Sequence, residues 1–185
     1  MGPGGGGTDG VGLRVGAGRS VAGSTSLSAF WGDTTGLFAV VFLIYSSGAV
    51  LSWASFGSSI GPSFFYPSAG VSMAAMLLTR RALWPAVVVA VLVGEVLVDT
   101  YYGNDTWQAI GFGVADVVEP LIGASVVLAW CGGRPDLRTR RHLTVFIAGA
   151  CLIGPFFGAL IGGSVSAHHD QKPWLNAVLN WWGGD

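Results

Sequence analysis

The most restrictive feature of the sequence is that residues 34–79 contain no charged side chain. About 20 apolar residues in a helix cross a lipid bilayer, so this stretch is too long for one crossing. The segment 57–63, GSSIGPS, interrupts it with the small and turn-forming residues that break helices. We therefore predict two membrane-spanning helices here, over residues 37–56 and 64–79.

The rest of the chain continues in the same way. Only 10% of its residues are charged and its mean hydropathy is +0.60, whereas soluble domains carry about 25% charged residues. Further spans are predicted over residues 83–98, 107–130 and 143–165, and a sixth begins near Leu175 and stops at Asp185. The predicted fold is all-α, a polytopic transmembrane helix bundle with five complete spans plus the start of a sixth.

The N-terminal residues have a different character. Residues 1–33 are rich in glycine and contain no apolar run, so they cannot bury enough surface to become ordered. We expect 1–33 to be a disordered cytoplasmic tail and 34–185 to be an incomplete transmembrane domain.

Basic residues predict the orientation. Arg80 and Arg81 lie between the second and third predicted spans, and four more arginines lie between the fourth and fifth: Arg134, Arg138, Arg140 and Arg141. The loops after the first and third spans contain no Lys or Arg. This alternation follows the positive-inside rule and places the N-terminus in the cytoplasm. The net charge of −1 indicates no nucleic-acid partner.

Four acidic residues fall in the predicted spans or at their ends. Glu95 and Asp99 are four residues apart, and Asp116 and Glu119 are three apart, so each pair shares a helix face. No Lys or Arg lies inside a predicted span, and an ionised acid at mid-membrane costs about 2.5–3.5 kcal/mol on insertion scales. These acids are candidates for a ligand, cation or proton site.

A packing role explains the same acids without a ligand. They could hydrogen-bond to Ser, Thr, Trp or backbone groups and hold helices together. Pro120 favours this alternative, because a proline there leaves the carbonyl of Asp116 without its usual helical partner and favours a kink. The residues alone leave both interpretations open.

Candidates for metal binding or catalysis are few. His168 and His169, with Asp170, are predicted to lie in an outer loop and are weak candidates for zinc ligands, because adjacent ligands on a short loop rarely form a site. The sequence has no nucleophile–base pair or phosphate-binding loop, so we expect neither a metal, a cofactor nor an enzymatic activity.

Four motifs occur in order along the chain, and the first lies in FFYPSAGVSMAAMLLTRRALWPAV, residues 64–87, at Tyr66, Pro67, Ala69, Gly70, Arg80, Arg81, Trp84 and Pro85. This motif, with the three that follow it, resembles the bacterial membrane-associated sensor domain of the type-one MASE family. The family usually has Trp and a second Pro where this chain has Tyr66 and Ser68. The second, ADVVEPLIGA, is similar to an Asn–x–x–Glu segment, with Asp116 replacing Asn and Glu119 matching. The third is GPFFGALIGG, at Pro155, and the fourth is NWWGGD, at Trp181, Trp182, Gly184 and Asp185.

The resemblance implies a sensory input domain of the bacterial inner membrane that responds to an unknown small-molecule or ion signal. Family members usually have more spans than we predict here and precede a cytoplasmic kinase, cyclase or phosphatase module, which this chain lacks. Two alternatives remain: a small transporter or channel component that uses the intramembrane acids, and a non-functional fragment of a longer sensor. The residues leave the oligomeric state open, a homodimer included.

Overall fold

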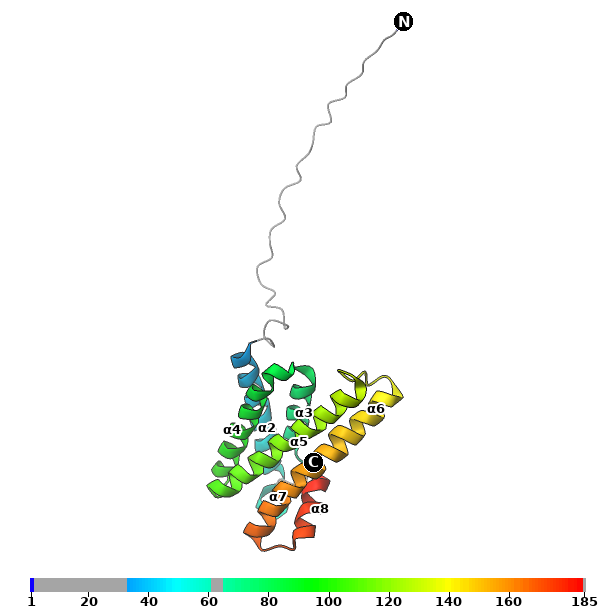
Figure 1. Cartoon of the computed structure of the whole chain (residues 1–185). Helices are drawn as coiled ribbons and strands as arrows, with labels where there is room; N and C mark the ends of the chain where they lie inside the picture. The colour runs from blue at the N-terminus through cyan, green and yellow to red at the C-terminus, as the bar shows by residue number, and fades with distance from the viewer. Residues whose placement is uncertain (2–32, 61–64, 185) are drawn as a thin grey trace.

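The computed structural model describes Met1, residues 33–60 and residues 65–184 (Figure 1). None of these residues lies in a β-strand, so the predicted all-α fold is confirmed for this part of the chain. The prediction of a disordered tail concerns residues that lie, apart from Met1 and Asp33, outside the described ranges. Asp185, at the end of the fourth motif, also lies outside them.

The helices follow one another with short connections. In chain order they are α2 (Thr34–Ile60), α3 (Pro67–Leu78), η2 (Arg81–Leu83), α4 (Trp84–Tyr101), α5 (Thr106–Cys131), α6 (Arg140–Phe146), η3 (Ile147–Ile153), α7 (Gly154–Asp170) and α8 (Trp174–Gly184). Most of the large, fully buried side chains come from α2, α3, α4 and α5 and include Leu37, Val41, Met76, Val87 and Val127, and α7 contributes Pro155.

Four segments are long and apolar enough to cross a bilayer: Thr34–Ser55, Arg81–Tyr101, Thr106–Cys131 and Arg140–Asp170. The predicted second span is instead the 12-residue helix α3, about 18 Å long at 1.5 Å per residue, against a hydrocarbon core of about 30 Å. The prediction of five complete spans is therefore not confirmed. The last helix, α8, begins at Trp174, beside the predicted start, and is described as far as Gly184.

Of the four prolines inside predicted spans, the two that lie far from a span's start, Pro120 and Pro155, behave differently from each other. Helix α5 continues through Pro120 from Thr106 to Cys131. By contrast, the segment before Pro155 is the π-helical η3, which joins α6 to α7. In a regular α-helix the ring of Pro155 would meet the carbonyl of Cys151, which lies in η3. A wider π turn at this position removes that clash.

Helix α5 occupies the centre of the bundle and contacts α3, α4, α7 and η3 (Figure 1). Glycines allow the closest of these approaches. A Cβ added to Gly154 would lie 2.8 Å from the carbonyl oxygen of Glu119 and 3.2 Å from Cα of Gly123. Small residues let membrane helices approach until their backbones touch, so α7 can pack directly on α5 only with glycine at this position.

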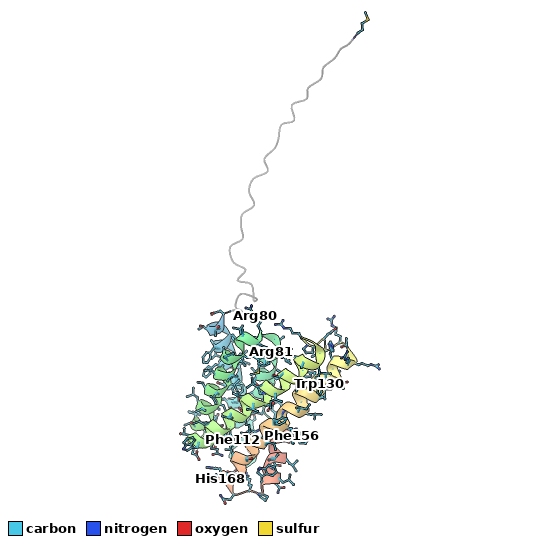
Figure 2. All side chains as sticks on the ribbon, viewed as in Figure 1. Arg80, Arg81, Phe112, Trp130, Phe156 and His168 are labelled. Carbon is cyan, nitrogen blue, oxygen red and sulfur yellow. The ribbon has the colours of Figure 1, made fainter. Side chains whose placement is uncertain are left out.

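The two ends of the bundle differ in charge. Figure 2 shows Arg80 and Arg81 at the same end as Trp130, close to the end of α5, and His168 at the opposite end. The loop that carries Arg134 and Arg138 follows α5 directly, so the two arginine-containing connections lie at one end. This arrangement agrees with the alternation of basic loops in the sequence.

Replacing Gly154 by Ala tests the glycine contact. Because the neighbouring atoms belong to the backbone, we expect Gly154→Ala to lower the free energy of unfolding by about 1–3 kcal/mol, as overpacking does. Gly70→Ala is the matched control: an added Cβ there meets nothing within 4 Å, so stability should be equal or higher. Thermal unfolding in detergent micelles measures both. Equal stability of Gly154→Ala and the wild type would contradict the tight α5–α7 contact.

Candidate functional site

The hydroxyl of Tyr45 lies at the meeting point of two buried acids. Its oxygen is 2.6 Å from Oδ2 of Asp116 and 3.0 Å from Oε2 of Glu95. The hydroxyl of Tyr66 lies 3.1 Å from that of Tyr45 and donates to the same Glu95 oxygen. We call Tyr45, Tyr66, Glu95 and Asp116 the acid–tyrosine cluster. It joins α2, α4, α5 and the residue that precedes α3.

The number of tyrosine hydroxyl hydrogens limits which hydrogen bonds the cluster can form at one time. Each phenol carries a single hydrogen, so Tyr45 donates to only one carboxyl at a time. Its shorter distance is to Asp116, which leaves the Tyr66 hydrogen for Glu95. Two hydroxyl hydrogens therefore serve two carboxyls, and a proton or cation gained or lost here changes which bonds can form.

Neighbouring residues hold Tyr45 in place. Its side chain is 0% exposed, and its carbonyl accepts a hydrogen bond of 2.8 Å from Oγ of Ser68. On the other side, a Cβ at Gly94 would lie 3.1 Å from Cδ1 of Tyr45. The glycine that precedes Glu95 thus lets α4 approach α2 closely enough for the hydroxyl to reach both acids.

Asp99 extends the polar region toward the end of α4. The indole Nε1 of Trp53 donates to its Oδ1 at 3.2 Å, and the Trp53 ring stacks on Tyr102 at 5.1 Å between centroids. Asp99 is only 2% exposed, and its Oδ2 has no hydrogen-bond partner among the described residues. Helix α2 therefore presents Tyr45 and Trp53 to the two acids of α4.

Glu119 faces a different part of the bundle. A Cβ at Gly158 of α7 would lie 3.1 Å from its Cβ and 3.2 Å from its Oε2. Glu119 is 3% exposed and lines a cavity between α3, α5, α6 and η3. Of the four predicted acids, the structure thus brings Glu95 and Asp116 together, places Asp99 one helical turn beyond Glu95, and puts Glu119 on the α7 side of α5.

The remaining motif residues mostly shape helix ends and contacts. Pro67 starts α3, and Pro85 and Pro155 lie in the first turns of α4 and α7, where proline fits a helix. Trp84 donates from Nε1 to the carbonyl of Met76 at 3.0 Å, under the guanidinium of Arg81. The other described members lie as follows: Ala69 and Gly70 on α3, Arg80 exposed after it, Trp181 against Gly162 and Phe112, Trp182 bonded to the carbonyl of Leu152, and Gly184 at the end of α8.

The two histidines lie in the last turn of α7 and not in the loop where the sequence placed them. The helix continues to Asp170, five residues beyond Val165, where the predicted span ends. Nδ1 of His169 is 3.1 Å from Oδ2 of Asp105, the residue that caps the start of α5. Within the described ranges no three His, Cys, Asp or Glu side chains gather as a metal site would require.

Two candidate functional residues were not predicted from the sequence. Tyr45 and Trp53 lie in the uncharged stretch, and nothing in their spacing separates them from ordinary apolar positions. The sequence does contain a signal for Tyr45. A phenol in the middle of a span needs a hydrogen-bond partner, and the intramembrane acids are the strongest acceptors in the predicted spans. Tyr66 was identified only through its motif.

Comparison with known proteins identifies the family. The family model described as MASE1 matches residues 22–185, nearly the whole chain. The chain belongs to the MASE1 family. This confirms the resemblance seen in the motifs and, with the four apolar helices, identifies the chain as a membrane-associated, multi-pass helical sensor domain. No curated protein and no solved structure matches the chain.

The role of Tyr45 in this MASE1 domain is testable by removing one oxygen. We expect Tyr45→Phe to lower the free energy of unfolding by about 1–3 kcal/mol, because the buried Asp116 carboxyl loses the hydrogen bond that Tyr45 donates. Tyr101→Phe is the control, since the Tyr101 side chain is 82% exposed. Thermal unfolding in nanodiscs compares the two. In a double-mutant cycle with Asp116→Asn, additive losses would mean that Tyr45 and Asp116 are not coupled.

Proposed function

We propose that this MASE1 domain is a sensory input module of a bacterial inner membrane, and that its acid–tyrosine cluster responds to the signal. The observation that carries the proposal is the position of the Tyr45 hydroxyl, within hydrogen-bonding distance of acids on two other helices. A small molecule or ion that alters either acid changes the contacts of α2, α4 and α5 at once.

The energies involved are of a suitable size. A hydrogen bond to a charged group contributes about 1.5–3 kcal/mol, and allosteric coupling between two sites is typically about 1–3 kcal/mol. Rearranging one or two bonds in the cluster is therefore enough to shift the packing of the helices. The signal must interact more strongly with one packing than with the other.

In this proposal the domain transmits and does not catalyse. Its partner is a cytoplasmic kinase, cyclase or phosphatase module, joined to it or associated with it. The N-terminus and the arginine-rich loops face the cytoplasm, and a homodimer would bring two output modules together.

The proposed orientation predicts which loops are reachable from outside the cell. In a chain with Cys131→Ser and Cys151→Ser, a membrane-impermeant maleimide should label Asn104→Cys in intact cells and Leu137→Cys only after permeabilisation, because positively charged loops remain inside. Both variants should label equally in lysed cells, which controls for expression and reactivity. Labelling of Leu137→Cys in intact cells would reverse the orientation.

The signalling role is tested by joining the catalytic domain of a diguanylate cyclase to the N-terminus, which the proposal places in the cytoplasm, and measuring cyclic dinucleotide in cells. We expect Glu95→Gln and Tyr45→Phe to change output by about fivefold or more, the lower range of allosteric coupling. Asp136→Asn is the matched control, because Asp136 is an exposed acid outside the cluster.

Two results would contradict the proposal. The first is unchanged output from cluster variants that insert in the membrane and fold as the wild type does. The second is an ion flux into proteoliposomes that the wild-type chain supports and the Glu95→Gln variant does not. That result would favour a transporter or channel.

A further inference from the structure

A cavity of about 420 Å³ lies on the side of α5 that Glu119 faces. Its volume falls within the range of about 300–1,000 Å³ that is usual for small-molecule sites. One face of α3 forms a wall, with Gly70, Ala74 and Leu78 exposed at intervals of four residues. Phe146 and Ala150 contribute to the opposite wall. Glu119 and Arg134 are its only charged lining residues.

The cavity extends along α3 from the arginine-rich end of the bundle. From Leu78 to Gly70, α3 rises about 12 Å, which is close to the thickness of one leaflet of a hydrocarbon core of about 30 Å. Arg134 closes the cavity at the arginine-rich end, where its guanidinium donates to the carbonyl of Leu78. Glu119 lies some twelve residues before the end of α5, about 18 Å deeper at the helical rise.

Positive charge gathers at the end of the bundle where Arg134 lies. Arg80 and Arg81 follow α3 directly, and their position beside the end of the bundle is visible in Figure 2. Among the described residues of this end, six arginines stand against two aspartates, Asp33 and Asp136. Basic pockets between membrane helices on the cytoplasmic side bind anionic lipid head groups.

We infer that this cavity is a binding site for an anionic phospholipid of the surrounding leaflet. The phosphate lies at Arg134 and one acyl chain fills the apolar space along Gly70, Ala74 and Leu78. The charge of Arg134, the apolar walls and the leaflet-sized depth each match one part of such a lipid. This inference stands independently of the proposed sensory role, because it uses neither the acid–tyrosine cluster nor any output.

The test measures lipid retention by native mass spectrometry of the purified full chain, with phosphatidylglycerol and phosphatidylcholine of identical acyl chains as probes. The wild type should retain phosphatidylglycerol preferentially. Arg134→Gln should weaken phosphatidylglycerol binding about fivefold, the contribution of one arginine at an anionic surface, and leave phosphatidylcholine unchanged. Arg138→Gln is the control, because Arg138 does not line the cavity.

The acyl-chain site is tested without changing charge. Gly70→Leu places a side chain in the cavity, and the open space around Gly70 indicates that the fold tolerates it. It should abolish retention of both lipids, whereas Gly183→Leu, at another glycine with open space but in α8, should retain them. Inorganic phosphate in excess should not compete, since it lacks the chain.

A second measurement needs no cavity variant. Cys151 lines the cavity and Cys131 does not. In a Cys131→Ser chain, phosphatidylglycerol should slow maleimide labelling of Cys151 more than phosphatidylcholine does. Equal retention and equal labelling with the two lipids would overturn the inference. A second result would also overturn it: tetraphenylphosphonium binds tightly and displaces phosphatidylglycerol, and Glu119→Gln abolishes this binding. The occupant of the cavity would then be a lipophilic cation.

Discussion

The bundle depends on satisfying two carboxyls where no bulk water is available. In the hydrocarbon core an unsatisfied polar group costs several kcal/mol, so Glu95 and Asp116 must find donors within the protein. The Tyr45 hydroxyl reaches both acids, and Tyr66 adds a second donor. Because these four residues come from α2, α4, α5 and the start of α3, the requirement fixes how four helices meet. The short helix α3 follows from it too: Tyr66 must stay beside Glu95, and Pro67 begins the helix immediately afterwards.

Glycines make this arrangement possible on both sides of α5. Gly94 admits Tyr45 next to Glu95, and Gly154 and Gly158 admit α7 against the backbone and side chain of Glu119. A methyl group at Gly154 would meet backbone atoms that cannot rotate away, so each contact is close to an all-or-none packing choice. Tight packing of this kind has few intermediate states. A small change in the cluster is therefore more readily passed on as a shift of whole helices than absorbed locally.

Features that depend on charge and hydropathy could be predicted from the sequence. Features that depend on which residues meet in three dimensions could not. The all-α fold, the four long spans and the family follow from uncharged runs, arginine-rich loops and ordered motifs. The length of α3 could not be predicted, because residues 64–79 are as apolar as a full span and only the position of Tyr66 shows where the helix must start. The sequence also did not predict that Asp116 and Glu119 lie in two different surroundings. A spacing of three places Asp116 and Glu119 near one face, yet a central helix has neighbours on several sides: Asp116 meets Tyr45 of α2, and Glu119 lies against Gly158 of α7.

Helix α5 consequently separates two chemically different environments. On one side a phenol and two carboxyls form a polar contact with α2 and α4; on the other, Glu119 lies between the glycines of α7 and an apolar cavity. Pro120 follows Glu119 inside a helix that continues to Cys131, and its nitrogen carries no hydrogen to donate within the helix. The π turn of η3 lies against this part of α5 through the contact of Gly149 with Gly123. π turns and proline sites are where membrane helices bend most easily. The Gly149–Gly123 contact therefore joins the two places in these helices where bending costs least, and it connects the central helix to the π turn that borders the cavity.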